Sequence, residues 1–455
     1  MTRQIGDHAV VLGASLSGLC AARVLAESFA AVTVVERDTL PVAVASRRGV
    51  PQGRHLHALL PRGRRVLDSL FDGLSAELVT AGAPTGDGLG NVRWLLSGRR
   101  LRQVDIGEQG LFLSRPFLEG HVLARVRALP RVEFLDGHDV SGVTSGADRV
   151  TGVRVQDRAG GPGRVLDADL VVDCTGRGSR TPVWLAELGH PGPAEDRVRI
   201  EVAYASRLYR FRPGAMGADR LILCGWTPAC PRGAAVAELE GGRHIVTLAG
   251  MLGEAPPTDP DGFVEFASRL PFPDVHELIR AGEPLDDPVA FRYPANVRRR
   301  YERLRRFPAG LLVLGDAVCS FDPIYGQGMT VAALQAEVLR AELARGRVPA
   351  PRRYFRRIAR VLDAPWGIAT GGDLAFPGVQ GRRTPMIRLV NAYLPRLHAA
   401  AETDARLGAA FIRVTGLIAR PEGLLRPDRV LRVLRGARNG AARGLGEHRE
   451  RQPAR

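Results

Sequence analysis

The start of the chain alternates between short apolar runs and one segment with helical spacing. Residues 8–12 read HAVVL, residues 20–29 read CAARVLAESF, and residues 32–36 read VTVVE. The glycine-containing turn GASLSGL separates the first run from the helical segment. This order predicts a strand, a tight turn, a helix and a second strand, a βαβ unit completed within 30 residues.

Further runs of strand length come much later in the chain. They lie at residues 132–135, 150–155, 169–172 and 311–314. Strands scattered in this way predict a nucleotide-binding domain that is interrupted by long insertions.

The longest insertion has a different pattern. Between residues 198 and 252, apolar and polar side chains alternate, as in RIEVAYASRLYRF, which is the period of a half-buried strand. Gly241 and Gly242 stand between two apolar runs, as the two-residue turn of a β-hairpin does. We therefore expect an antiparallel sheet here, with helix and strand from residues 62–100 beside it.

Helical spacing dominates beyond about residue 330, and the residues after Gly436 are rich in arginine and glycine, as in a mobile tail. We expect four parts: a nucleotide-binding domain (residues 1–61, 101–185 and 290–345), a substrate domain (62–100 and 186–289), a C-terminal helical region (346–435) and a mobile basic tail (436–455).

The charge pattern excludes several functions. The formal net charge is +16, and all 64 basic residues are arginine. Without lysine the chain cannot form a Schiff base, place a Walker-type lysine on a phosphate, or support a lysine-dependent halogenation site. The arginines are scattered among acidic residues without interleaved aromatic residues, so nucleic acid is not an expected partner.

The cysteines and the apolar runs limit metal binding and location. The five cysteines include no C-x-x-C pair and have no histidine at ligand spacing, so we expect no metal site and a reduced, cytoplasmic setting. No uncharged apolar run reaches the length of about 18 residues that a transmembrane helix needs.

The first motif with chemistry is GASLSG, at residues 13–18. It matches the dinucleotide fingerprint except that Ser15 replaces the second glycine. Gly13 permits the tight turn, the small Ser15 lets a pyrophosphate approach the backbone, and Gly18 lets helix and strand pack closely. The phosphates then lie at the positive end of the helix.

Glu36 follows at the end of the second strand, 18 residues after Gly18. An acidic residue there accepts hydrogen bonds from the hydroxyls of an adenosine ribose. The ribose is then unphosphorylated, which favours FAD or NAD over NADP. Arg37 and Arg48 are assigned to the same cofactor-binding set.

A second motif favours FAD over NAD. The apolar run LLVL is followed directly by Gly315 and Asp316, and Asp316 is a suitable acceptor for a ribityl chain. After a proline-containing loop, a helix begins whose first N–H groups can offset negative charge on a reduced isoalloxazine. The residues assigned to this half of the site are Asp316, Pro323, Gly326, Gly328 and Met329.

With both motifs, the chain resembles the FAD-dependent monooxygenases of the aromatic-hydroxylase and squalene-epoxidase superfamily, in which a GD-x(n)-P-x-x-G-x-G loop precedes a helix. The resemblance spans residues 9 to about 345. It implies an α/β fold with a Rossmann-type FAD-binding domain of the glutathione-reductase-like, aromatic-hydroxylase type, an inserted antiparallel β-sheet substrate domain and a C-terminal helical region. It also implies insertion of one oxygen atom from O2 through a flavin hydroperoxide.

The same resemblance assigns a role to Arg115, in LSRPFLEGHVLARV. It is similar to the arginine that opens a long helix and reaches the ribityl or phosphate region of the flavin. An arginine that only caps a surface helix is the alternative.

Three segments are similar to those of a bacterial subgroup that includes the lasalocid and monensin polyether epoxidases. They are RRGVPQGRHLHALLPRG, DLVVDCTGRGSRTPVWLAELG and YGQGM. This similarity implies epoxidation of an alkene in a polyketide or terpenoid secondary metabolite, with O2 and a small apolar or aromatic substrate as partners.

One position departs from the aromatic hydroxylases, which carry an Asp-Gly pair where this chain has Thr175-Gly176. That acidic residue links flavin and NADPH in the resembled family, and Asp173 lies two residues earlier at a different depth. Direct reduction by NAD(P)H and electron supply by a separate flavin reductase therefore both remain open.

The expected substrate pocket is aromatic. Tyr204 and Tyr209 fall on opposite faces of one strand, so at most one faces the pocket. His55 and His57 suggest a catalytic base, but histidines that only hydrogen-bond or stack beside the cofactor are the favoured interpretation. The residues assigned to the pocket are Tyr204, Trp226, Phe291 and Tyr293, and each is also compatible with ordinary core packing.

The absence of a strong base favours epoxidation, because phenol hydroxylation is helped by removal of the phenolic proton. Aromatic hydroxylation, an oxygen-independent reductase or dehydrogenase acting on isoprenoid double bonds, and a non-catalytic redox module are the alternatives.

Overall fold

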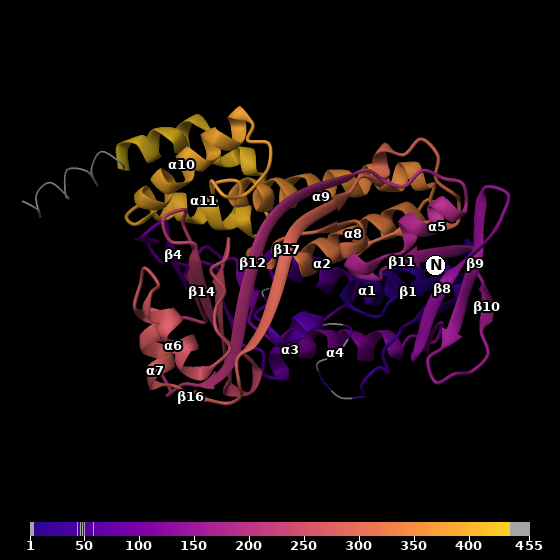
Figure 1. The fold of residues 1–455 in the computed structure, drawn as a ribbon, viewed down its shortest axis with the longest axis horizontal. Coiled ribbons are helices and arrows are strands. Elements are labelled where there is room, and N and C mark those ends of the chain that lie inside the picture. The colour runs from indigo at the N-terminus through magenta and orange to yellow at the C-terminus, as the bar shows by residue number, and fades with distance from the viewer. Residues whose placement is uncertain are drawn as a thin grey trace, which may run out of the picture.

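The computed structural model describes residues 4–42, 44–45, 47, 49, 51–57 and 59–436. It shows an α/β protein with a parallel sheet, antiparallel sheets and a helical C-terminal region, which confirms the predicted fold class (Figure 1). The predicted mobile tail lies, apart from Gly436, outside the described residues.

The parallel sheet has the order β18-β11-β1-β2-β7. Its strands are almost entirely apolar, as expected for a sheet covered on both faces. Four of the predicted apolar runs and the first run of the chain form this sheet, with the bounds β1 Gly6–Leu12, β2 Phe29–Val35, β7 Val132–Leu135, β11 Leu170–Asp173 and β18 Leu311–Val313.

One predicted strand lies elsewhere. Residues 150–155 belong to β9 (Arg149–Asp157), the central strand of a separate antiparallel sheet with β8 (His138–Gly146) and β10 (Arg164–Asp167). Its alternating burial fits a sheet with one solvated face. This small sheet lies at the edge of the molecule, beside the parallel sheet (Figure 1).

The predicted antiparallel sheet is the largest in the molecule. Its hairpin turns through Glu240, Gly241 and Gly242, because the Leu239 N–H donates to the Arg243 carbonyl, so the loop is longer than the two-residue turn predicted. The φ angles of Gly241 and Gly242, 71° and 65°, are both left-handed. The order is β19-β17-β12-β15-β14-β13-β4-β5, with β16 paired to β12. The bounds are β4 Val92–Leu96, β5 Arg99–Arg100, β12 Glu195–Arg210, β13 Leu221–Cys224, β14 Arg232–Glu238, β15 His244–Gly250, β16 Glu283–Pro284, β17 Val289–Arg299 and β19 Cys319–Ser320.

The long strands β12 and β17 run side by side from the antiparallel sheet toward the parallel-sheet half (Figure 1). β17 pairs along its length with β12, although the sequence analysis counted its residues with the nucleotide-binding domain. The predicted limits of the nucleotide-binding and substrate domains stay a prediction. A short ladder, β3 (Thr85–Asp87) with β6 (Gln109–Leu111), completes the strands of the described residues.

Helices cover both the parallel-sheet half and the antiparallel-sheet half of the molecule. The main core packs α1 and α8 against one face of the parallel sheet, with α2, α4 and α9 around them. The bounds are α1 Leu16–Leu25, α2 Pro61–Leu70, α3 Leu74–Thr80, α4 Arg115–Arg127, α5 Thr181–Glu187, α6 Pro260–Ser268, α7 Asp274–Ala281, α8 Gly328–Leu343, α9 Pro351–Asp373, α10 Pro385–Ala401 and α11 Ala405–Thr415. The predicted helical segments beyond residue 330 are thus confirmed.

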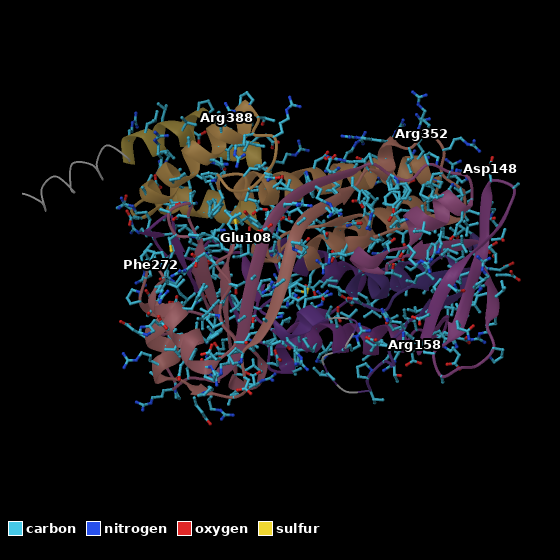
Figure 2. All side chains as sticks on the ribbon, viewed as in Figure 1. Glu108, Asp148, Arg158, Phe272, Arg352 and Arg388 are labelled. Atoms are coloured by element: carbon cyan, nitrogen blue, oxygen red, sulfur yellow. The ribbon has the colours of Figure 1, made fainter. Side chains whose placement is uncertain are left out.

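The surface arginines are spread over the molecule. The exposed residues Arg158, Arg352 and Arg388 lie on separate outer parts of the molecule (Figure 2). Among the described residues, no helix combines the length and the apolar character needed to cross a membrane.

Candidate functional site

The first glycine turn joins β1 to α1. Gly13 has a φ of 95°, which a residue with a side chain rarely adopts. A Cβ added to Gly18 would lie 1.8 Å from the Gly13 carbonyl oxygen, so strand and helix approach as closely as the fingerprint requires. The turn is therefore a cradle that only glycine at these two positions permits.

Glu36 lies beside this cradle, at the carboxyl end of β2. Its carboxylate accepts hydrogen bonds from the Ala14 N–H at 2.7 Å and the Asp38 N–H at 3.0 Å. Arg47 approaches the same carboxylate to 3.4 Å, and its buried Nη1 has no hydrogen-bond partner among the described residues. Glu36 is thus held in the position predicted from its spacing, with an under-satisfied guanidinium next to it.

Arg115 opens α4, and Ser114 caps that helix by accepting from the Phe117 N–H. The Arg115 side chain reaches back to the first turn, where Nη2 donates to Ser15 Oγ at 2.8 Å. Arg115 therefore joins the predicted phosphate turn and does not only cap a surface helix.

Glu119, one helical turn after Arg115, is a site residue that the sequence analysis missed. It accepts from Arg115 Nε at 3.0 Å, Ser15 Oγ at 2.7 Å and the Leu16 N–H at 3.1 Å. Burial opposes its ionisation, but Arg115 and Arg47 outweigh burial and hold the pKa of Glu119 below its usual value. The start of α1 therefore already binds an anionic group, and the i,i+4 spacing from Arg115 was the signal available in the sequence.

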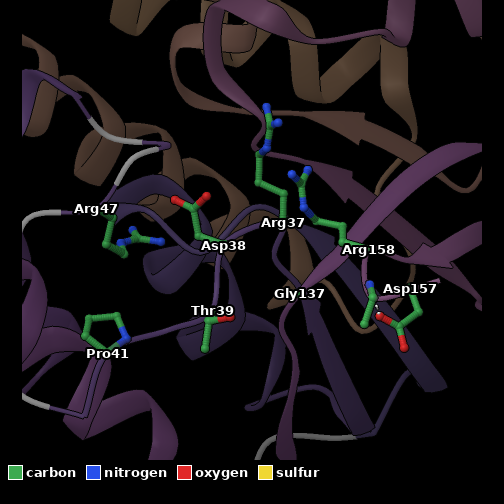
Figure 3. A pocket seen from close by; sticks show the side chains of 9 residues that line it. Arg37, Asp38, Thr39, Pro41, Arg47, Gly137, Asp157 and Arg158 are labelled. Carbon is green, nitrogen blue, oxygen red and sulfur yellow. Dashed lines mark hydrogen bonds between the residues drawn. The ribbon is translucent and has the colours of Figure 1, made fainter. Parts of the chain in front are cut away.

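A cavity of about 560 Å³ is lined by residues that directly follow Glu36 in the chain, among them Arg37 and Asp38 (Figure 3). Arg37 and Arg158 line one part of it, and Asp38 and Arg47 another. Arg37 thus lines this cavity, and its role in cofactor binding stays a prediction. Arg48, assigned to the same set, lies outside the described residues.

The second motif, which begins with Gly315 and Asp316, forms a second cradle directly after β18. Gly315 has a φ of 75°, and a Cβ there would lie 2.8 Å from the Ser17 Cβ, so this strand end touches the first residues of α1. Burial raises the pKa of Asp316, while Arg115 and Arg177 oppose that rise. Motifs that are 300 residues apart in the chain therefore meet beside Arg115.

The loop after Asp316 ends where α8 begins. Pro323 starts a single 3-10 turn, Gly326 takes the left-handed conformation with φ 63°, and Gly328 is the first residue of α8. A Cβ at Gly328 would meet no atom within 4 Å, so open space adjoins this helix start. Met329 is buried in the main core behind it.

The four predicted pocket aromatics belong to one cluster. Tyr204 of β12 stands opposite Phe291 of β17, with ring centroids 5.3 Å apart. Tyr293 lies under the Arg177 guanidinium at 5.0 Å, and Trp226 lies farther along, next to Phe376 at 6.1 Å. Tyr209 packs in a different core cluster on the other sheet face, as the alternation predicted.

The two histidines are neutral. His55 stacks edge-on against Tyr204 at 4.7 Å and hydrogen-bonds Ser206 Oγ through Nδ1 at 2.9 Å. Burial and the neighbouring Arg54 lower the pKa of His55 to about 4. Burial and Arg115 lower the pKa of His57 to about 3. Both are weak bases, in agreement with the favoured interpretation.

A second cavity of about 470 Å³ lies beside His57 and Ser114. Its walls include Leu113, Leu208 and Ile245, with Arg54, Arg243 and Asp286 also in the lining. A mainly apolar wall with a few polar groups is the usual character of a small-molecule site. The sequence analysis missed this cavity because its lining comes from segments far apart in the chain.

Asp173 is unsuited to the role of the missing Asp-Gly acid. Its fully buried carboxylate accepts from the Thr175 N–H and from the hydroxyls of Thr175, Ser179 and Thr181, at 2.5–2.9 Å. These four bonds hold its own loop, and Thr175 itself is exposed.

These residues fit FAD. The glycine cradle, the anion-binding start of α1, the under-satisfied Arg47 and the open space at Gly328 suit a long dinucleotide with a pyrophosphate in its middle.

The FAD dependent oxidoreductase family matches residues 9–191. Protein Rv3254 of Mycobacterium tuberculosis is 36% identical over 441 residues, covering 92% of each chain. The chain belongs to the FAD-dependent oxidoreductases.

Two further similarities are more distant. Kynurenine 3-monooxygenase of Salinispora arenicola is 35% identical over 174 residues, which are 37% of this chain and 36% of that protein. The structure of the flavin-dependent brominase Bmp2 has a TM-score of 0.66 at 15% identity, covering 98% of this chain and 100% of that one. At such identity the structural likeness shows the fold alone.

Proposed function

We propose that this FAD-dependent oxidoreductase is a monooxygenase that epoxidises a carbon–carbon double bond of an apolar polyketide or terpenoid metabolite. The observation that carries the proposal is the aromatic cluster around Tyr204 and Phe291, in which the adjacent histidines are weak bases. His55 and His57 have lowered pKa values, and burial raises the pKa of Tyr204, so all three stay neutral near pH 7. Alkene epoxidation needs no base, whereas phenol hydroxylation is aided by one.

The residues that would hold FAD follow from the two cradles. Gly13, Ser15 and Gly18 would receive the pyrophosphate, and Glu36 the adenosine ribose. Asp316 would bind the ribityl chain, and the start of α8 would face the pyrimidine side of the flavin. When bound and reduced, FAD supplies oxygen activation, with one oxygen atom transferred to the substrate and the other released as water.

The chain's own contribution is enclosure and orientation. The face formed by Tyr204 and Phe291 offers an apolar, aromatic wall against which an unsaturated substrate can be held, and a dry pocket limits side reactions. Arg177 over Tyr293 places a fixed positive charge at the pocket edge. Four hydrogen bonds keep Asp173 inside its loop, which favours electron supply by a separate flavin reductase over direct NAD(P)H binding.

Aromatic hydroxylation is the second candidate. It is favoured by the partial likeness to kynurenine 3-monooxygenase and by the neighbouring rings of Tyr204 and Phe291, which also suit a planar ring. Halogenation is disfavoured because the chain has no lysine.

The test is product analysis with isotopic oxygen. The purified protein is loaded with FAD, reduced without air, mixed with a panel of polyenes, terpenes and phenols, and exposed to ¹⁸O₂. We expect epoxides that carry one ¹⁸O atom. Labelled phenols would favour the second candidate, and products formed equally without oxygen would identify a reductase and contradict the monooxygenase assignment.

A further inference from the structure

A buried polar cluster lies behind the loop of the second cradle, where three elements meet. Asn296 of β17 accepts from the Asp322 N–H at 2.5 Å and donates through Nδ2 to Asp373 Oδ2 at 2.6 Å. The Tyr325 hydroxyl donates to Asp373 Oδ1 at 3.0 Å. The cluster therefore ties the loop to β17 and to the last residue of α9.

The approach of α9 to the loop depends on a glycine. A Cβ added to Gly372 would lie 2.3 Å from the Tyr325 hydroxyl oxygen. Any larger residue at position 372 would push the loop away from α9. The helix end is thus shaped to receive Tyr325.

The two carboxyl groups have no cation to balance them. Asp322 is 1% exposed and Asp373 is 0% exposed, and among the described residues no arginine or histidine hydrogen-bonds either carboxyl. The ionisable groups that face them are phenols, namely Tyr325 of the loop, Tyr204 of β12 and Tyr293 of β17. Two buried carboxylates in contact cannot both be charged at ordinary pH.

The donors decide which carboxyl is ionised. Asp373 receives hydrogen bonds from Asn296 and Tyr325, as a carboxylate does. Asp322 Oδ1 accepts from the Ile324 N–H, whereas its buried Oδ2 has no partner that donates to it. Burial and the charge of Asp373 raise the pKa of Asp322 well above its usual value, and burial raises the pKa of Asp373 to about 7. The unpartnered Oδ2 of Asp322 is therefore the atom on which a proton shared with Asp373 would lie.

We propose that Asp322 and Asp373 share one proton and that this pair is a positioning lock, which fixes the cofactor loop Asp322–Gly328 to the end of α9. The proposal rests on the cofactor site described above. It makes the C-terminal helical region a part of that site, because the loop conformation that presents Gly326 and Gly328 depends on α9.

The lock predicts an asymmetry between two amide variants. In Asp322→Asn the amide still donates to Asp373, so the loop stays in place. In Asp373→Asn, an N–H₂ group replaces one carboxylate oxygen and faces either the Nδ2 donor of Asn296 or the hydroxyl donor of Tyr325. That buried donor then loses its acceptor. Asparagine has nearly the shape of aspartate, so a role in packing alone would treat both variants alike.

The measurement is the dissociation constant of FAD, followed by flavin fluorescence at pH 8 in the full-length protein. We expect Asp322→Asn to remain within about threefold of the wild type and Asp373→Asn to weaken binding about tenfold or more, the usual cost of an unsatisfied buried donor. Asp428→Asn, at an exposed carboxyl paired with Arg426, is the matched control and should change nothing. Equal losses in the two buried variants would overturn the proposal.

The pH profile gives a second readout. As pH rises through the raised pKa of Asp322, the wild type loses the shared proton and its FAD affinity falls. Asp322→Asn has no proton to lose, so its affinity stays level over that range, while the three phenols, whose pKa values burial raises, remain neutral. The same alkaline fall in both proteins would contradict the lock.

The unfolding temperature without FAD separates this inference from the proposed function. Wild type that never binds FAD would refute the cofactor assignment. The asymmetry between Asp322→Asn and Asp373→Asn would still appear in their unfolding temperatures if the lock exists, and its absence there would refute the lock by itself.

Discussion

The two ends of the proposed cofactor site are built in opposite ways. The first cradle is bordered by ion pairs, in which Arg47 approaches Glu36 and Glu119, and Arg115 contacts Glu119. The second cradle is assembled from distant elements. Behind it lies a buried carboxyl pair, Asp322 and Asp373, that has no cation beside it among the described residues. A charged network is stabilised by ionisation, whereas a shared-proton pair is stabilised by keeping a proton.

The two cradles should therefore respond to pH in opposite directions. The lowered pKa of Glu119 adds stability above its unfolded value of 4.5, and this contribution is lost as pH falls. The raised pKa of Asp373 adds stability below its unfolded value of 3.8, and this contribution is lost as pH rises toward about 7. Variants at each end separate the two effects.

The largest effect is expected from Gly18→Ala in the first cradle. The new Cβ would lie 1.8 Å from a backbone oxygen that cannot move without breaking the turn. We expect a loss of more than about 3 kcal/mol in unfolding free energy, or insoluble protein. Chemical denaturation measures it, with Gly367→Ala as the control, since that exposed helical glycine has open space around it. Wild-type stability in Gly18→Ala would show that the turn is not packed as described.

Asp316→Ala should have the next largest effect, and it acts on the second cradle. The variant should be soluble and colourless, because one charged hydrogen bond to the ribityl chain is lost, which weakens FAD by about 10- to 100-fold. Absorbance at the flavin bands after purification measures the loss. Recovery of one flavin per chain would remove Asp316 from the site.

These two variants also show what the sequence alone can predict. Gly13, Gly18 and Glu36 lie within one βαβ unit, so their spacing encodes their geometry, and the structure places them together. Asp322 and Asp373 are 51 residues apart and meet only through the packing of α9, so no local pattern reveals them.

Two other features were predicted only in part. The pairing of Tyr204 with Phe291 depends on a register shift between Arg199 and Val202 that alternation does not encode, although the sequence assigned both residues to one pocket. Residues 150–155 were correctly taken as a strand, but they pair with the neighbouring residues 138–146 and 164–167 and not with the parallel sheet, which was not foreseen.

Glu36→Ala should have a smaller and selective effect. It removes the ribose acceptor and also the acceptor of the Ala14 N–H, so FAD affinity should fall by about tenfold. FMN lacks the adenosine half, so its weaker binding should change much less. Parallel titrations of the variant with both flavins measure the difference, and equal losses would place Glu36 outside the site.

Glu119→Gln should have the smallest effect, present at neutral pH and shrinking in acid as the wild-type carboxylate takes up a proton. The amide keeps an acceptor for the Leu16 N–H but removes the charge between Arg115 and Arg47. Unfolding temperature should fall less between pH 7 and pH 4 than in the wild type, by a difference on the order of 1 kcal/mol in stability. Parallel acid curves for the two proteins would mean that Glu119 does not carry the charge assigned to it.

The most direct test of the whole site is calorimetric titration of the flavin-free wild type with FAD and, separately, with FMN. Two cradles that grip opposite halves of one molecule predict a single FAD per chain, bound at least about tenfold more tightly than FMN. No heat of binding for FAD, or equal affinity for the two flavins, would contradict the account.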